Sequence, residues 1–405
     1  MSSLLVTGIS ELWTVDPSRG PDGILTDAAV VLDGEQVAWV GARADAPDAD
    51  DRLDVGGRAV LPGWVDSHTH LVFAGDRSSE FDARMAGRPY AAGGIGVTVE
   101  ATRATSECTL TRLVVERVRE AEAGGTTTLE TKTGYGLDVD GEVAAARLAA
   151  GLVETGVLDT VTFLGAHLVP AEASSADDYV DLVCGPMLEA VRPYVQWADV
   201  FCESGAFTVE QSRRVLQACA AAGLGLRVHG NQLGESGGVA LAVELGAASV
   251  DHCNHLSDND VDALASSDTV ATLLPACDLS TRAPLAPARR LVDAGATIAL
   301  ASNCNPGTSF TSSMAFCVAT AVLQQRLSLD EAITAGTLGG AKALRRDVES
   351  GESAALPVGS IAVGARADLH VLDAPAAIHL AYRPGMPLSW ATIRRGRLVH
   401  HKEKH

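Results

Sequence analysis

The chain has 405 residues, of which 47% are hydrophobic and 20% charged, and 51 acidic against 31 basic side chains give a formal net charge of −20. This apolar fraction can bury a large core, which excludes wholesale disorder, and the length predicts either one large barrel or two domains. The acidic balance argues against nucleic-acid binding, because phosphate recognition requires a basic face.

The sequence also gives expectations about membranes and cellular compartment. No apolar run is long enough to span a bilayer, and the first residues lack the pattern of a secretory signal. The eight cysteines are scattered and form no CxxC pair. We therefore expect no membrane association and reduced thiols in a cytoplasmic protein.

The two ends of the chain share a strand-rich texture. Residues 28–42 contain two β-type runs around Asp33-Gly34, which is a hairpin signal. Similar β-type runs return in residues 359–374 and 389–401. We predict that residues 1–60 and 358–405 together form a small composite β-sandwich domain.

Residues 61–357 alternate β-type runs with helical patterns. The helical patterns include residues 109–125, 208–225 and 258–268. The predicted strands cover 63–70, 126–134, 160–167, 198–205, 224–230, 248–253, 269–275 and 297–303. Eight βα units of this kind predict an α/β fold, a (β/α)8 TIM barrel. A doubly wound open sheet is the alternative, but no GxGxxG motif opens a helix after a strand.

Polar side chains gather where these predicted strands end. A barrel carries its functional groups at the carboxyl ends of its strands, so these residues are expected to share one site. They are His68, His70, Lys132, His167, Glu203, His229, His252 and Asn303.

A pair of histidines ends the first predicted barrel strand. His68 and His70 lie two positions apart, so both imidazoles face the same side of the strand. Two unrelated surface histidines are the alternative, but His229 and His252 end two further strands. Imidazole is a preferred ligand of zinc and iron, and a catalytic metal ion activates water. The pattern therefore favours a metal-dependent hydrolase.

Several longer motifs resemble those of the imidazolonepropionase family, within the amidohydrolase superfamily. They are LPGWVDSHTHLVFAGDR, ETKTGYGL, FLGAH, VFCESGAFTVEQSRR, DHCNHLSD, NPGTSFTSS and GARADLHVLDAPAAIHLAYRPG. The resemblance spans nearly the whole chain. It implies a barrel of the metal-dependent hydrolase type, one divalent metal ion (zinc or iron), and a role in histidine catabolism. The implied reaction is hydrolysis of the cyclic amide bond of 4-imidazolone-5-propanoate to N-formimino-L-glutamate.

The resemblance also implies roles for individual residues. Metal ligands are expected at His68, His70, His229 and position 303, and catalytic groups at His252, Gln232 and Asn303. For Arg77, which is expected to contact the substrate, the alternative is a surface ion pair with Asp76 or Glu80. For His252, the alternative is a hydrogen bond to Asp251. Packing at a turn is the alternative for Tyr135, and a simple Asn-Pro turn is the alternative for Asn305. Substrate contacts are expected at Arg77, Tyr90, Tyr135, His167, Asn305, Gly307 and Thr308.

The sequence departs from the family pattern at three places. Asn303 stands where an aspartate is expected, and His229-Gly230-Asn231-Gln232 lacks an acidic residue beside the histidine. Residues 275–278 also differ from the expected PGAxF. An amide is a weaker ligand than a carboxylate and cannot accept the proton of water.

These departures leave several interpretations open. The chain is either a working imidazolonepropionase, a paralogue acting on a related imidazolone or cyclic amide, or a catalytically impaired form that still binds ligand. A nucleobase or creatinine-type deaminase shares the HxH motif but does not predict FAGDR or NPGTSF. A small anionic imidazolone is the expected partner, and a homodimer is the default assembly.

Overall fold

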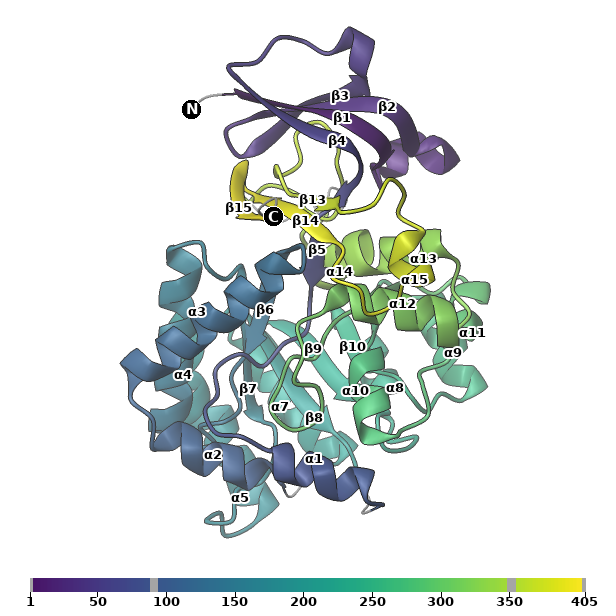
Figure 1. Cartoon of the computed structure of the whole chain (residues 1–405). Coiled ribbons are helices and arrows are strands. Elements are labelled where there is room, and N and C mark those ends of the chain that lie inside the picture. The colour runs from purple at the N-terminus through teal and green to yellow at the C-terminus, as the bar shows by residue number, and fades with distance from the viewer. Residues whose placement is uncertain (1–2, 88–93, 348–354, 403–405) are drawn as a thin grey trace. The chain divides into compact units, whose positions relative to one another are not determined.

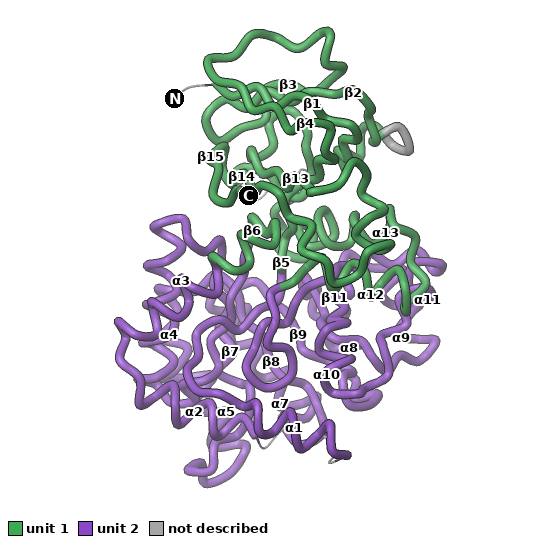
Figure 2. Tube along the Cα trace, viewed as in Figure 1, with its two compact units in different colours: residues 1–66, 119–128, 313–405 green, residues 67–118, 129–312 purple. Residues whose placement is uncertain are grey.

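A computed structural model describes residues 3–87, 94–347 and 355–402. The chain divides into two compact units (Figure 2). Unit 1 comprises Met1–Asp66, Arg119–Thr128 and Ser313–His405, and unit 2 comprises Ser67–Val118 and Leu129–Ser312. The domain boundaries drawn from the sequence stay a prediction.

Eight parallel strands form the first sheet, in the order β12-β11-β10-β9-β8-β7-β6-β5; Figure 1 labels β5 to β10. The sheet is nearly closed, because a parallel bridge joins Thr69, just after β5, to Cys304, just after β12. Seven of the strands fall within their predicted runs, and β8 begins one residue before its run, at Trp197. The strands are β5 (Trp64–Asp66), β6 (Thr126–Lys132), β7 (Thr160–Ala166), β8 (Trp197–Cys202), β9 (Gly225–Gly230), β10 (Ser249–His252), β11 (Val270–Leu273) and β12 (Ile298–Leu300).

These strands are buried along almost their entire length. Every residue of β6 and β7 is buried, which is typical of a parallel sheet covered by helices on its outer face. The fold class predicted from the sequence, an α/β (β/α)8 barrel, is therefore confirmed. The alternative of a doubly wound open sheet is wrong, since the bridge between Thr69 and Cys304 joins the two ends of the strand order.

Helices alternate with the barrel strands. Thr208, Ser257 and Ser328 begin α7, α9 and α13 with complete capping boxes, which satisfy the first backbone N–H groups of each helix. The described helices are α1 (Ser78–Met85), α2 (Ile95–Arg103), α3 (Glu107–Ala123), α4 (Val139–Glu154), α5 (Ala176–Leu182), α6 (Leu188–Val191), α7 (Val209–Ala221), α8 (Gly238–Glu244), α9 (Asp258–Ala265), α10 (Pro275–Thr281), α11 (Ala288–Asp293), α12 (Met314–Gln324), α13 (Leu329–Thr334), α14 (Gly340–Ala343) and α15 (His379–Tyr382).

The second sheet is mixed and draws its strands from both ends of the chain, in the order β15-β14-β13-β4-β1-β2-β3. The predicted hairpin is present, because β2 and β3 pair up to Asp33 and Gln36, and Gly34 takes a positive φ of 56° in the turn. The strands are β1 (Ser3–Trp13), β2 (Ile24–Asp33), β3 (Gln36–Ala42), β4 (Asp51–Pro62), β13 (Leu369–Leu372), β14 (Ser389–Arg394) and β15 (Arg397–His401).

One face of the mixed sheet carries the hydrophobic core of unit 1. Val6, Val30, Val60, Leu369 and Ile393 belong to this core and come from five different strands. Burial of such side chains contributes roughly 1.5–3 kcal/mol each, which ties the two ends of the chain together. Within the described residues, no helix combines the length and the apolar character needed to cross a membrane.

A buried histidine in unit 1 should make stability depend on pH. His370 of β13 is 1% exposed, and neither of its ring nitrogens has a hydrogen-bond partner among the described residues. Burial, with a smaller effect of His400, lowers the pKa of His370 from 6.5 to about 3. Below pH 6.5 the unfolded chain binds a proton at this histidine, whereas the folded chain does not. The free energy of unfolding should therefore fall by about 1.4 kcal/mol for each pH unit below 6.5.

The variant His370→Phe should lack this contribution, so its unfolding should depend less steeply on pH between about 4 and 6. Urea unfolding of metal-free protein across that range measures the difference in slope. The control, Leu398→Phe at an exposed position of the same sheet, changes no titratable group and should keep the wild-type slope. Equal slopes in wild type and His370→Phe would contradict the assignment.

Candidate functional site

The predicted site residues that the structure describes all lie in unit 2, at the carboxyl ends of the barrel strands. His68 and His70 follow β5, and hydrogen bonds from Asn303 N to His68 O and from His70 N to Cys304 O fix them against the segment after β12. The N···O distances are 3.0 and 2.9 Å. Backbone pairing at the barrel closure therefore brings the first and eighth strand ends together.

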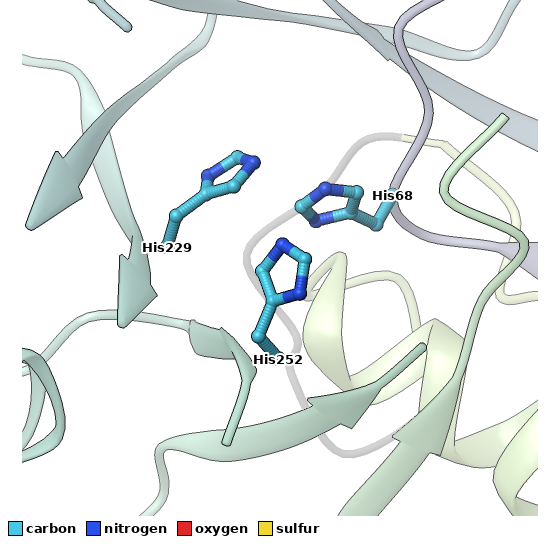
Figure 3. Close-up of side chains that lie close together, drawn as sticks. All are labelled: His68, His229 and His252. Carbon is cyan, nitrogen blue, oxygen red and sulfur yellow. The ribbon is translucent and has the colours of Figure 1, made fainter. Parts of the chain in front are cut away.

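The three imidazoles predicted as metal ligands meet through their Nε2 atoms. The Nε2 atom of His70 lies 3.3 Å from that of His68 and 3.4 Å from that of His229. His252 also joins the cluster: its ring points toward those of His68 and His229 (Figure 3), and ligand atoms of these three residues lie within 4.8 Å of one another.

Carboxylates orient two of these rings. His68 Nδ1 lies 2.6 Å from Asp251 Oδ2, and His229 Nδ1 lies 2.9 Å from Asp199 Oδ2. Both contacts are buried. When Nδ1–H faces a carboxylate, the other ring nitrogen presents a lone pair, which is the usual arrangement of a metal-binding histidine.

This donor set fits a divalent metal ion. Burial is the main reason that the pKa values of His68 and His70 lie well below 6.5, so both rings are neutral at physiological pH. The Nε2 lone pairs of His68 and His229 then both lie close to Nε2 of His70. His70 can donate only one N–H from that atom, so it can satisfy only one of the two lone pairs. Two nitrogens bound to a tetrahedral zinc at about 2.0–2.1 Å lie roughly 3.3 Å apart, which matches the observed spacings.

A pocket of about 400 Å³, counting space open to solvent, lies against these imidazoles. It brings together most of the residues that the sequence predicted for catalysis and substrate binding. Its lining consists of His70, Arg77, Ile95, Tyr135, His167, Phe201, His229, Gln232, His252, Asn303, Asn305 and Thr308.

Arg77 lines the pocket and is also paired with a carboxylate. Its Nε and Nη2 atoms donate to the two oxygens of Glu80, at 2.8 and 2.9 Å. The third nitrogen, Nη1, faces Gly307, where an added Cβ would lie 2.3 Å away. The ion pair considered as an alternative is thus present, and it holds the guanidinium in the pocket wall. Gly307 lets the loop after β12 approach it.

Asn305 forms the turn that was considered for it. Its Oδ1 accepts hydrogen bonds from the backbone N atoms of Gly307 and Thr308, both at 2.8 Å. Its Nδ2 donates to Asn303 O and to Thr308 Oγ1. The side chain therefore shapes the loop in this structure, and its contact with a substrate carboxylate stays a prediction.

Asn303 and Gln232 sit beside a buried thiol. Asn303 is 3% exposed and has a φ of 53°, a left-handed conformation that asparagine and aspartate tolerate well. Gln232 Nε2 lies 3.8 Å from Cys277 Sγ. Burial, followed by the charge of Asp278, raises the pKa of Cys277 to about 12, so a protonated thiol borders these two amides.

Tyr135 and His167 form one side of the pocket with His70. The rings of His70 and His167 stack with centroids 5.3 Å apart, and the ring of Tyr135 lies 5.5 Å from that of His167. Three backbone N–H groups between Gly134 and Leu137 donate to the buried carboxylate of Glu142, which shapes the turn that carries Tyr135. Tyr90, also predicted to contact substrate, lies outside the described residues.

His252 has an unusual backbone conformation. Its φ is 86° and that of Cys253 is 56°, and two successive non-glycine residues with positive φ store strain of the kind found at functional sites. The alternative of a hydrogen bond to Asp251 is wrong: among the described residues Asp251 Oδ1 has no hydrogen-bond partner, and Oδ2 lies 2.6 Å from His68 Nδ1. Within the described part of the chain, His252 Nδ1 has no hydrogen-bond partner.

Two residues that shape this site had no predicted role in it: Asp199 and Asp251 orient two imidazoles. Glu203, which was expected at the site, accepts hydrogen bonds from the backbone N atoms of Gln232 and Leu233. Asp251 precedes His252 in a strand, and Asp199 is a charged residue within an otherwise apolar strand. A buried acidic residue in a barrel strand is the signal that could have found them.

Comparisons with known proteins find relatives that match nearly the whole chain. The sequence profile of the amidohydrolase family matches residues 59–393. The chain is 64% identical over 404 residues to the imidazolonepropionase of Arthrobacter sp. (strain FB24), covering 97% of this chain and 99% of that protein. It is also 64% identical over 410 residues to the imidazolonepropionase of Micrococcus luteus, covering 98% and 99%.

Solved structures share the fold at low sequence identity. A zinc-bound variant of the atrazine chlorohydrolase TrzN from Arthrobacter aurescens TC1 superposes with a TM-score of 0.72 at 18% identity, covering 98% of this chain and 95% of that one. An adenosine deaminase from Xanthomonas campestris with bound zinc gives 0.69 at 19% identity, covering 98% and 92%. These similarities support the barrel fold.

Proposed function

We propose a function for this chain from one premise: it belongs to the amidohydrolase family and, within it, to the imidazolonepropionases. The function is hydrolysis of the ring amide of 4-imidazolone-5-propanoate to N-formimino-L-glutamate, a step of histidine degradation. One observation carries the proposal: the converging imidazoles and the guanidinium of Arg77 line the same pocket.

The metal centre would be held by His68, His70 and His229, with His252 close by. When bound, a divalent ion would polarise the ring carbonyl and make water more acidic. Neutral imidazoles suit both zinc and iron, and zinc is favoured here because the Nε2 spacings match a tetrahedral site.

The remaining residues of the chain bind the substrate and move its protons. Burial is the main reason that the pKa of His252 lies well below 6.5, so its imidazole is neutral and can accept the proton of the attacking water. The same group can then protonate the ring nitrogen as the C–N bond breaks. Arg77 would bind the propionate, because a guanidinium pairs strongly with a carboxylate.

An assay of the purified protein tests this function. Zinc-loaded protein is mixed with 4-imidazolone-5-propanoate, the loss of its ultraviolet absorbance is followed, and N-formimino-L-glutamate is identified as the product. Turnover with that product supports the proposal. Binding of the substrate without turnover would favour the catalytically impaired form, and neither binding nor turnover would overturn the substrate assignment.

The substitution Arg77→Met should weaken substrate binding without abolishing the chemistry. Loss of a charge-assisted contact costs about 3 kcal/mol, so KM should rise roughly 100-fold while kcat changes only a few-fold. Steady-state kinetics separate the two constants. Arg112→Met, which removes an exposed arginine paired with Glu116, should leave both constants unchanged. An unaltered KM in Arg77→Met would place the propionate elsewhere.

The free thiols fit the cytoplasmic location proposed with this function. All eight cysteines are unpaired with one another, and Cys202, Cys219 and Cys277 are among those buried in the interior. Such a set is typical of a reducing compartment.

A further inference from the structure

A lysine ammonium is buried among the carboxylates that support the imidazole cluster. Lys132 is the last residue of β6 and is fully buried. Its Nζ atom lies 3.0 Å from Glu130 Oε1, 2.9 Å from Asp199 Oδ2 and 3.7 Å from Asp251 Oδ2. Burial alone would lower the pKa of Lys132, but these carboxylates raise it, so the side chain is charged at neutral pH.

Each of the three carboxylates also contacts the segment that carries a predicted metal ligand. Asp199 lies against His229, and Asp251 against His68. Glu130 accepts a hydrogen bond of 3.1 Å from the backbone N of Thr69, the residue between His68 and His70. The ammonium of Lys132 is therefore linked to the positions of all three imidazoles, through a different carboxylate in each case.

This arrangement would not persist without the ammonium. Three buried carboxylates close to one point repel one another, and removing the ammonium that contacts all three leaves less compensated negative charge in the interior. The carboxylates would then move apart or take up protons. Movement would break the contacts that direct the Nε2 atoms of His68 and His229, and protonation would weaken them, because a neutral carboxyl group is a weaker acceptor than a carboxylate.

We propose that Lys132 is a positioning residue of the metal centre. Its ammonium holds Glu130, Asp199 and Asp251 in the arrangement that directs the imidazoles toward one point. The inference rests on the proposed function, because it requires that these imidazoles bind a divalent ion. It assigns Lys132 no contact with the substrate.

Zinc affinity is the direct test. Protein freed of metal is titrated with Zn²⁺ in competition with a chromophoric chelator, for the wild type and for Lys132→Met, which keeps the length of the side chain without its charge. Loss of a group that orients metal ligands costs about 10–100-fold in metal affinity, and we expect a decrease of this size. The Co²⁺-loaded proteins should also differ in their visible absorption, which reports the ligand geometry.

A charge-balanced double variant separates positioning from neutralisation and covers the case in which Lys132→Met does not fold. The variant Lys132→Met/Glu130→Gln removes one cation and one anion together, and the glutamine keeps an oxygen for Thr69 N. We expect it to fold and still to bind zinc at least 10-fold more weakly than the wild type. Recovery of wild-type affinity would overturn the positioning role.

A buried arginine in unit 1 provides a matched control. Arg366 pairs with Asp368 at 2.6 Å and donates to Thr127 O near the start of β6, the same strand that ends at Lys132. Arg366→Met should lower the midpoint of urea unfolding but leave zinc affinity unchanged. If it weakened zinc binding as much as Lys132→Met, the effect would be general destabilisation and the inference would fall.

The wild-type titration distinguishes failure of this inference from failure of the proposed function. A wild type that binds no zinc would overturn both the metal centre and the role of Lys132. A wild type that binds zinc with the same affinity and the same Co²⁺ spectrum as both Lys132 variants would overturn the role of Lys132 alone.

Discussion

Replacing His229 with alanine should reduce the hydrolytic rate by a factor on the order of 10³–10⁴ and should remove bound metal. His229 contributes one of the three converging Nε2 atoms, and its Nδ1 atom faces Asp199. Without it, two of the three predicted ligands remain, and Oδ2 of buried Asp199 keeps its contact with the ammonium of Lys132. Elemental analysis and the rate of substrate loss measure the two effects on the same preparation.

The matched control for this variant is His255→Ala. His255 is a partly exposed histidine three residues after His252, in the motif DHCNHLSD. Its replacement should leave the metal content unchanged and the rate within about two-fold. A His229→Ala protein that kept its metal and its activity would show that the imidazole cluster is not the metal centre.

Replacing Asn303 with aspartate should raise kcat, by a factor on the order of 10²–10⁴. Position 303 lines the same pocket as His252, and its backbone N is fixed by the hydrogen bond to His68 O. A carboxylate there could accept a proton from water and would add an anionic oxygen donor beside neutral imidazoles, so zinc affinity should rise as well. Aspartate tolerates the positive φ of this position as asparagine does.

The exposed substitution Asn259→Asp makes the same chemical change away from the site and should alter neither quantity. A steep rise in kcat for Asn303→Asp alone would show that the amide limits catalysis in this chain. If neither kcat nor zinc affinity changed, position 303 would be neither a ligand nor a base, and His252 would be left as the main proton acceptor.

The barrel strands and the polar groups near their ends could be predicted from the sequence. The runs were short, all but the run 269–275 carried one of the polar residues named above, and the two-residue period of a strand placed His68 and His70 on one face. The longer motifs added Arg77 and the loop from Asn305 to Thr308. These features are local, so a single sequence is enough to reveal them.

The partners of these groups were decided by the tertiary structure. Asp251 is 183 residues from His68, and Glu80 rather than solvent lies against the guanidinium of Arg77. The side chain of Asn305 is used to close its own loop, although the same motif was equally compatible with binding a carboxylate. A polar group can have two chemically acceptable partners. Packing across the barrel decides which of them it contacts, and strand periodicity does not encode this packing.

By itself, the sequence determined the class of chemistry: a barrel whose strand ends carry imidazoles, one guanidinium and an asparagine at position 303. Only the tertiary structure decided that Asp199, Asp251 and Glu130 surround the ammonium of Lys132 next to those imidazoles. The physical reason is that burial of a charge is tolerated only where an opposite charge is also buried. That pairing exists only once separate strands of the barrel have been brought side by side.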